Sequence, residues 1–194
     1  MKHIFLNLKR FDIPKQMGGV NSIADIDNWG AYIVKNTEEK LQTYKKDQVD
    51  FTIFFPELHI LEANAARKIG SPIQIGCQGV LRTDVYPGGN FGAFTAGRPA
   101  AAMKAAGCDA VIIGHCEERN FLNNVLSEAG ITDADAINRI LNEEIKAAVR
   151  RGMKVLYCIG EKSEEQEHWQ NVLGRQLELG LKDVDHSMVI VAYE

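Results

Sequence analysis

The 194 residues of the chain are enough to bury the core of one domain, and a composition of 45 % hydrophobic and 25 % charged residues is ordinary for a globular protein. The net charge of −4 gives no reason to expect nucleic acid or an anionic membrane surface as a partner. No apolar run approaches the roughly 18 residues of a membrane-spanning helix, and the start of the chain is too polar for a signal peptide, so we expect a cytoplasmic protein.

Short apolar runs alternate along the chain with longer amphipathic segments. The runs are rich in Ile, Val and Phe and predict strands that are buried on both faces, as in a parallel sheet. They span residues 4–8, 51–55, 72–77, 110–114, 155–160 and 188–193. The amphipathic segments predict helices over 26–44, 58–69, 99–106, 134–151 and 164–180, with a shorter one over 117–128. This alternation predicts an α/β fold with a parallel sheet, in a single domain over 1–194.

Two of these helices are preceded by residues with the spacing of a capping box. The segments are Thr132–Asp135 and Ser163–Gln166, and we expect them to start the helices at 134 and 164.

The cysteines and histidines do not predict a metal site. Cys77, Cys108, Cys116 and Cys158 stand far apart with no CxxC pair, which fits a reducing compartment. Three of the four lie at the end of an apolar run or just past it, where a buried thiol is the simplest expectation. No two histidines have metal-ligand spacing beside a carboxylate. The glycine-rich phosphate loops of nucleotide-binding folds are also absent from the sequence. We therefore expect no metal and no nucleotide cofactor.

Polar side chains gather where the predicted strands end. Asn7 and Lys9 lie at the end of the first strand, His115 and Glu117 follow the fourth, and Glu194 follows the sixth. Ligands of parallel α/β folds bind at the carboxyl ends of the strands. A lysine could supply positive charge there, a histidine could donate a proton near neutral pH, and a glutamate could abstract one. Each residue alone is more often structural, but their shared placement favours acid–base chemistry on an anionic substrate.

Six short segments at or near these strand ends follow one another along the chain. They are Asn7–Phe11, Ile75–Gln78, Gly92–Thr95, Ile112–Glu117, Leu156–Glu161 and Ala192–Glu194. In this order they resemble the Asn-Trp-Lys-Met-Asn, Gly-Ala-Gln-Asn, Gly-Ala-Phe-Thr, Ile-Ile-Gly-His-Ser-Glu, Cys-Val-Gly-Glu and Ala-Tyr-Glu segments of the triosephosphate isomerase family. The resemblance implies a (β/α)8 barrel, of which the chain holds the first six strands.

The resemblance also implies roles for the residues at the strand ends. Lys9 would bind the substrate's phosphate and stabilise the enediolate, with Asn7 beside it and Glu117 paired to it. His115 would be the neutral electrophile that polarises the carbonyl, and Glu194 would be the base that moves a proton between adjacent carbons. The family is a known example of a histidine kept neutral by a helix N-terminus. Cys158 would be a supporting residue.

The implied function is the interconversion of dihydroxyacetone phosphate and glyceraldehyde 3-phosphate in glycolysis and gluconeogenesis, without a cofactor. Two alternatives stay open. One is isomerisation of a related four-carbon ketose phosphate, such as an erythrulose phosphate. The other is a non-catalytic barrel that only binds ligands, which the joint presence of Lys9, His115 and Glu194 disfavours because binding alone needs no base.

The chain departs from the family pattern in its length and in a few motif positions. Barrels of this type usually run to about 250 residues, so we expect a piece of a longer protein, without the lid, the last two strands and the phosphate-binding glycines. The family's first motif has Trp and Met where Leu8 and Arg10 stand, and its serine after the catalytic histidine is Cys116.

The long segment 78–97 implies a homodimer, since in the family this segment reaches into the partner subunit. It contains Thr95 of the Gly-Ala-Phe-Thr motif. The family pairs a glutamate after this motif with an arginine across the dimer, whereas here Arg98 and Glu118 stand in the two regions. We therefore predict a charge-swapped pair, Arg98 with Glu118, at the dimer contact. The alternative is a surface loop ordered within its own subunit.

Overall fold

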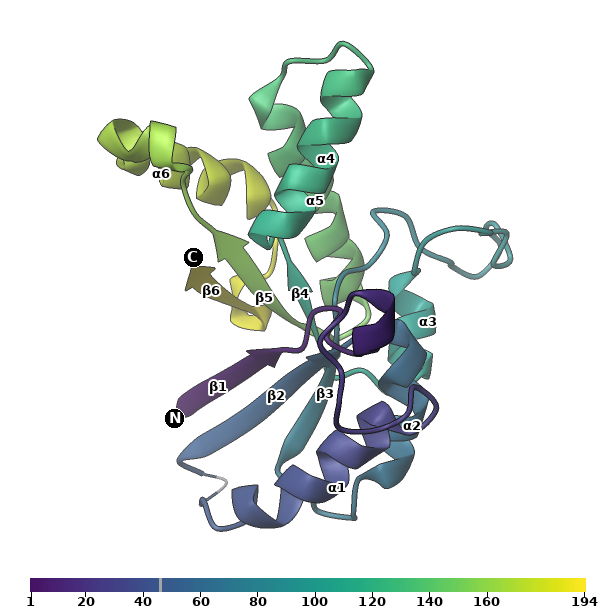
Figure 1. Ribbon diagram of the computed structural model, residues 1–194. Coiled ribbons are helices and arrows are strands. Elements are labelled where there is room, and N and C mark those ends of the chain that lie inside the picture. Colours follow the sequence, from purple (N-terminus) through teal and green to yellow (C-terminus); the bar gives the residue numbers. More distant parts are fainter. Residues whose placement is uncertain (46) are drawn as a thin grey trace. The chain divides into compact units, whose positions relative to one another are not determined.

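The computed structural model of the chain describes residues 1–45 and 47–194 and divides into two compact units. The first unit comprises Met1–Gln78 and Met103–Val111, and the second comprises Gly79–Ala102 and Ile112–Glu194. The described residues form six strands, β1 (Lys2–Asn7), β2 (Val49–Phe55), β3 (Ile73–Cys77), β4 (Ala110–Ile113), β5 (Lys154–Ile159) and β6 (Val189–Tyr193) (Figure 1). The α-helices are α1 (Trp29–Leu41), α2 (Ile60–Ala66), α3 (Ala100–Ala105), α4 (Cys116–Glu128), α5 (Ala134–Arg150) and α6 (Trp169–Gly180). Short 3₁₀ segments are η1 (Lys15–Met17), η2 (Glu57–His59), η3 (Ser163–His168) and η4 (His186–Met188).

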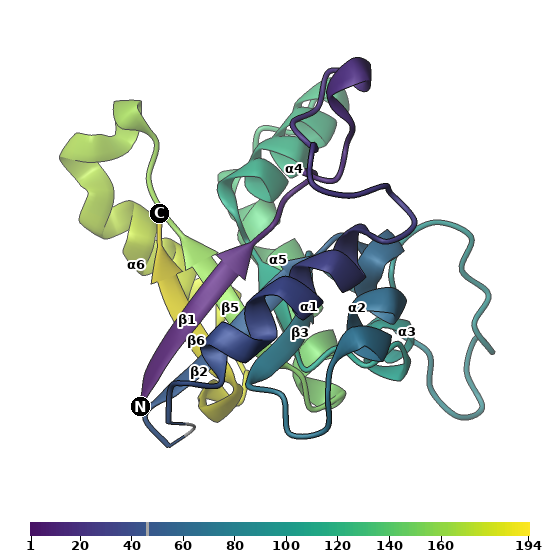
Figure 2. The same ribbon diagram turned by 60° about the horizontal axis from the view of Figure 1, so that its bottom comes forward.

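In the first unit, β1, β2 and β3 pair in parallel, and β3 pairs with the start of β4. Every residue of β2 from Asp50 to Phe55 is buried, as expected for a strand covered on both faces. Helix α1 buries Trp29, Ile33 and Val34, whose spacing places them on one face of a helix. Helices α1 and α2 pack against each other and against β3 (Figure 2).

In the second unit, β5 and β6 pair in parallel, with Tyr157 opposite Val191. Helix α5 packs on β5 and on α6. The residues of α5 that make this core, Leu141, Ile145 and Ala148, are fully buried and recur at helical spacing. The second unit thus carries the carboxyl ends of β4, β5 and β6, where the sequence places His115 and Glu194.

The predicted strands all appear within two residues of their expected bounds, and neighbouring strands follow one another in chain order. The predicted helix start at 134 is confirmed, since α5 begins at Ala134, whereas the predicted start at 164 is wrong. Asp133, not Thr132, caps α5, because its carboxylate accepts the Asp135 N–H at 2.9 Å. The segment predicted as helix 164–180 begins as the 3₁₀ segment η3, in which no residue of 163–168 is buried, so no core contact favours α-helix there. Its cap is Lys162, whose N–H donates to Glu165 Oε2 at 2.9 Å.

Within the described residues, no helix combines the length and the apolar character that crossing a membrane requires. The prediction of a single domain over 1–194 stays a prediction.

Candidate active site

His115 caps the N-terminus of α4, directly after the end of β4. Gly114 precedes it with a φ of +80°, a left-handed conformation that favours glycine. An added Cβ at Gly114 would lie only 2.8 Å from the carbonyl oxygen of Cys158, so the turn also needs the missing side chain. The turn presents the imidazole where the first N–H groups of α4 are unpaired within the helix.

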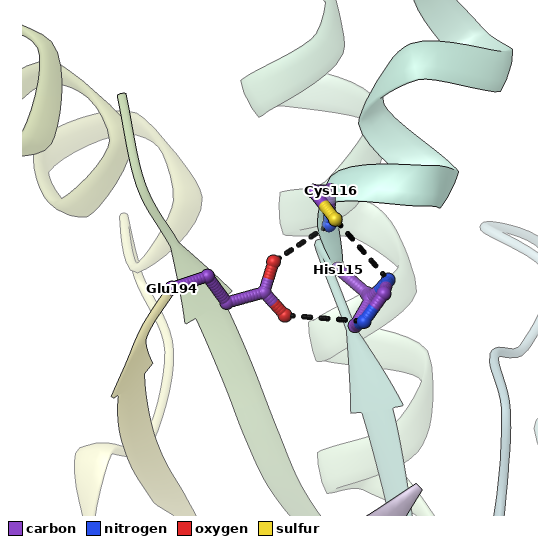
Figure 3. A group of neighbouring side chains, drawn as sticks. All are labelled: His115, Cys116 and Glu194. Carbon is purple, nitrogen blue, oxygen red and sulfur yellow. Dashed lines mark hydrogen bonds and ion pairs between the residues drawn. The ribbon is translucent and has the colours of Figure 1, made fainter. Parts of the chain in front are cut away.

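The hydrogen bonds of His115 indicate which ring nitrogen carries the proton. Nδ1 accepts the backbone N–H of Glu117 at 3.2 Å, so its lone pair faces the helix N-terminus. A neutral ring then carries its proton on Nε2. Nε2 lies 3.4 Å from Oε1 of Glu194. Figure 3 marks this interaction with a dashed line.

Glu194 follows β6, and its backbone N–H donates to the carbonyl oxygen of Ile159 at 2.9 Å. Its Oε2 accepts the backbone N–H of Cys116 at 2.8 Å, and its Oε1 faces His115. The side chains of His115 and Glu194 are 16 % and 27 % exposed, so both are accessible to a small ligand but largely shielded from bulk water. The arrangement places a carboxylate base opposite a hydrogen-bond donor.

Cys158 lies at the end of β5, in contact with the same carboxylate. Burial raises the pKa of its thiol well above the usual range, and the negative charge of Glu194 and a hydrogen bond to it add to the effect. The thiol therefore stays protonated near neutral pH and can donate to Glu194. This places the predicted supporting residue against the predicted base.

Arg119, which the sequence analysis did not single out, ties the ends of β4 and β5 together. Its guanidinium donates to the carbonyl oxygens of Gly114 at 2.8 Å and Cys158 at 3.0 Å. It also donates to the Tyr157 hydroxyl at 3.1 Å and to Asn138 Oδ1 at 2.9 Å. The sequence feature that could have identified Arg119 is its position four residues after His115, which places both residues on one face at the start of the helix.

Gln176 of α6, which the sequence did not indicate either, also holds the end of β5. Its side-chain Nε2 donates to the carbonyl oxygen of Gly160 at 2.8 Å, and its Oε1 accepts the N–H of Gly160 at 3.0 Å. Its backbone carbonyl accepts the Tyr157 hydroxyl at 2.9 Å. The side chain is buried, so these bonds are shielded from water.

Glu118 supports the turn before His115. Its Oε2 accepts the N–H of Gly114 at 2.6 Å, and it is hydrogen-bonded to Glu144 of α5. Burial raises the pKa of both carboxyl groups, and the charge of Glu118 raises that of Glu144 further, to about 9. Arg98 and Glu118 both lie beside Gly79, where an added Cβ would be 3.4 Å and 3.5 Å from their side chains. These two predicted dimer residues thus approach each other within one chain.

Asn7 and Lys9 lie in the first unit, at the end of β1. Lys9 has a φ of +46°, and its N–H donates to Asn7 Oδ1 at 3.0 Å. The amide of Gln78 donates to Asn7 Oδ1 at 3.2 Å, to the carbonyl oxygen of Lys9 at 3.0 Å and to that of Phe54 at 3.3 Å. Gln78 therefore holds the backbone that carries the predicted phosphate-binding lysine. The predicted pair of Lys9 with Glu117 joins residues of different units and stays a prediction.

A cavity of about 830 Å³ lies in the second unit, beside Cys116 and Glu194. Arg119, Gln176 and Arg175 also line it. Its volume is within the range of about 300–1,000 Å³ that small-molecule sites occupy. Among the described residues, one group of three side chains could offer ligand atoms to a metal ion, namely His115, Cys116 and Glu194.

Comparison with known proteins shows which family the chain resembles. A model of the triosephosphate isomerase family matches residues 27–194. The triosephosphate isomerase of Chlamydia muridarum is 31 % identical over 178 residues, which cover 86 % of this chain and 59 % of the relative. The triosephosphate isomerase of Syntrophotalea carbinolica is 36 % identical over 120 residues, 59 % of this chain and 42 % of the relative.

A solved structure, the triosephosphate isomerase of Bartonella henselae, superimposes with a TM-score of 0.67 at 25 % identity. The match covers 99 % of this chain and 67 % of that one. The chain thus spans less than two thirds of the length of the curated relatives that it matches. These matches confirm the predicted fold class, a (β/α) barrel of which the chain provides six strands, and the chain belongs to the triosephosphate isomerase family.

Proposed function

We propose that the protein interconverts dihydroxyacetone phosphate and glyceraldehyde 3-phosphate through an enediolate. The observation that carries the proposal is the pairing of His115 and Glu194, whose Nε2 and Oε1 lie 3.4 Å apart. With Nδ1 occupied by the Glu117 N–H, the imidazole offers a neutral Nε2–H donor directly opposite a carboxylate base. Neither binding nor a structural role requires this combination.

The reaction follows from these two groups. Glu194 accepts a proton from the carbon next to the carbonyl, and the electron pair of that C–H bond moves to give the enediolate. The Nε2–H of His115 donates to the developing oxyanion, a contribution of about 3–4 kcal/mol by analogy with oxyanion-hole donors. His115 then gives its Nε2 proton to this oxygen and takes up the hydroxyl proton of the adjacent oxygen. Glu194 returns its proton to the former carbonyl carbon, which completes the isomerisation. A positioned carboxylate base adds about a hundredfold or more in rate.

Substrate binding would rearrange the contacts of Glu194. Both carboxylate oxygens are engaged, one with the Cys116 N–H at 2.8 Å and the other with His115. A substrate oxygen would replace Glu194 as the acceptor of the Nε2–H. The carboxylate would then leave the Cys116 N–H to reach a substrate carbon.

The remaining roles belong to the same proposal. Lys9 would bind the phosphate and stabilise the enediolate charge, with Asn7 beside it and Glu117 as its partner. Two copies would associate through the segment 78–97, with Thr95, Arg98 and Glu118 near the contact. The substrate is a small phosphorylated sugar, the chemistry needs neither metal nor organic cofactor, and the reaction would serve glycolysis and gluconeogenesis in the cytoplasm.

The test is the kcat/KM of the full-length gene product for glyceraldehyde 3-phosphate. We expect a value near the diffusional ceiling of about 10⁸ M⁻¹s⁻¹, which triosephosphate isomerase is already known to approach. The variants Glu194→Gln and His115→Gln should lose most of this activity while keeping their fold. Activity on an erythrulose phosphate that exceeds activity on the triose would replace the substrate assignment. If neither substrate reacts with well-folded protein, the barrel is a binding protein and the proposal fails.

A further inference from the structure

Cys116, His115 and Glu194 bring together a thiol, an imidazole and a carboxylate. One ligand atom from each lies within 4.8 Å of the other two. Cys116 Sγ is 3.8 Å from Nδ1 of His115, and Nε2 of His115 is 3.4 Å from Oε1 of Glu194 (Figure 3). Cys116 is exposed, and the 830 Å³ cavity reaches both Cys116 and Glu194, so an ion has access from solvent.

We propose that these three side chains bind a thiophilic divalent cation such as Zn²⁺ or Cd²⁺. Thiolate, imidazole and carboxylate are the protein ligands that zinc takes, and three of them with a fourth position open to water make an accessible zinc site. Bonds of about 2.0–2.3 Å in a tetrahedral site place the ligand atoms about 3.3–3.6 Å apart. One ligand atom from each of the three residues lies within 4.8 Å of the other two, and the exposed Cys116 side chain can rotate to close the remaining distance around an ion.

Binding needs no oxidant and no co-reactant. The thiol of Cys116 loses its proton to solvent as the sulfur–metal bond forms, and the imidazole binds through one ring nitrogen with its single proton on the other. The carboxylate of Glu194 supplies the third bond. One proton leaves for each ion bound, and the net charge of the site rises by one.

Cys116 makes this site a property of the present chain, because the corresponding position in the resembling family motif is serine. We also expect a bound ion to inhibit the enzyme, an expectation that rests on the proposed function. A bound ion would occupy His115 and Glu194, so it would exclude the sugar phosphate rather than assist its reaction. A hard cation such as Mg²⁺ prefers oxygen ligands and should not compete.

The binding test uses the full-length gene product, freed of metal with a chelator and titrated with Cd²⁺. We expect the ultraviolet charge-transfer absorption of a cadmium–thiolate bond to saturate at one ion per chain. Cys77, Cys108 and Cys158 are buried and should not contribute. The matched variant Cys116→Ser should lose the absorption. The variant Glu194→Gln should keep the thiolate and weaken the binding about tenfold or more, since loss of a supporting partner alone typically costs 10–100-fold.

Two outcomes of the titration would overturn the inference. Absorption that persists in Cys116→Ser would place the thiolate elsewhere, and an unchanged Cd²⁺ affinity in Glu194→Gln would exclude the three-ligand site. The readout does not depend on catalysis, so an inactive protein that binds Cd²⁺ in this way would refute only the proposed function.

Activity provides the second readout. Zn²⁺ should raise the apparent KM for glyceraldehyde 3-phosphate, and a chelator should reverse the effect. The Cys116→Ser variant, compared with its own metal-free activity, should be far less sensitive to Zn²⁺. Equal sensitivity of the two proteins, or equal inhibition by Mg²⁺, would show that the inhibition does not arise at this site.

Discussion

Glu118 and Glu144 form a hydrogen-bonded pair of carboxyl groups next to the turn that presents His115. Burial raises the pKa of Glu144 most, followed by the charge of Glu118, and the result is about 9. At neutral pH Glu144 is therefore protonated and can donate to Glu118. The carboxylate of Glu118 can then accept both this proton and the Gly114 N–H. The proton that Glu144 shares with Glu118 thus helps to hold the backbone of Gly114, the residue before His115.

Replacing Glu144 by glutamine should stabilise the protein increasingly as the pH rises. The pKa of Glu144 is raised from 4.5 to about 9 on folding, so between these values the folded state keeps a proton that the unfolded state has lost. Stability then falls with rising pH by up to about 1.4 kcal/mol per unit, and a neutral amide removes this slope. Thermal unfolding from pH 5.5 to 8.5 measures the effect. The exposed neighbour Glu143→Gln is the control, and parallel unfolding curves for wild type and Glu144→Gln would contradict the prediction.

Gln78→Glu should disturb Lys9 without changing the size of the side chain. The amide nitrogen donates to three oxygens, whereas a carboxylate has no donor and would face them as like partial charges. Loss of these bonds should reduce the free energy of unfolding by about 1–3 kcal/mol and raise KM for the phosphorylated substrate. Urea unfolding and steady-state kinetics measure both effects. Gln48→Glu, at an exposed loop position, should change neither value. A similar result for the two variants would show that the Gln78 amide does not hold the backbone of Lys9.

At the scale of the element, helix α4 organises the candidate site through its first turn. Its capping residue is His115, its first N–H holds Glu194, and its fourth residue is Arg119. The guanidinium of Arg119 then connects the helix to the end of β4 and to the end of β5. The geometry of the candidate site therefore depends on one helical turn and on the strand ends that it contacts.

Arg119→Lys should weaken this connection although the charge is kept. An ammonium group has no planar fork and cannot reach four acceptors from one position. We expect a loss of about 1–3 kcal/mol in the free energy of unfolding and a decrease in kcat that exceeds the change in KM, because the ends of β4 and β5 lose alignment. Arg139→Lys, at an exposed site, is the matched control. Unchanged kinetics in Arg119→Lys would show that the strand ends are held by other contacts.

The elements and their order were predictable from the sequence because parallel strands buried on both faces leave continuous apolar runs, as in β2. The positions of His115 and Glu194 followed from the rule that polar residues at strand ends converge. The partners that hold them did not follow. Arg119 meets Cys158 39 residues away, and Gln78 meets Asn7 71 residues away, and no local pattern encodes such contacts. The 3₁₀ start before α6 was also missed, because capping residues fix where a helix begins but not whether its first turn finds core contacts.

At the scale of the whole molecule, the segment 78–97 exposes aromatic side chains that its own chain does not cover. Phe91 is 90 % exposed and Tyr86 is 65 % exposed. Exposed aromatic side chains are enriched at the centres of protein–protein contacts. Their position in this segment supports the proposal that two copies associate through it.

Phe91→Asp should therefore shift the full-length protein from dimer to monomer. A charge in the centre of a desolvated contact has no partner, and loss of an aromatic anchor typically costs about 2 kcal/mol or more of binding free energy. Sedimentation equilibrium over a range of protein concentrations measures the dissociation constant. Ile69→Asp, which changes a fully exposed apolar residue outside the segment, should leave association intact. Equal behaviour of the two variants would place the dimer contact elsewhere or show that the wild type is monomeric.

The amide of Gln176 has a consequence for self-association. A primary amide carries the same N–H and C=O groups as a peptide unit, and both are paired with Gly160. The side chain thus pairs with Gly160 as the backbone of a neighbouring strand would, at the point where the chain leaves β5 for η3. A backbone whose groups are already satisfied cannot template the addition of another extended chain. One buried glutamine therefore leaves neither backbone hydrogen-bonding group of Gly160 open to a neighbouring molecule.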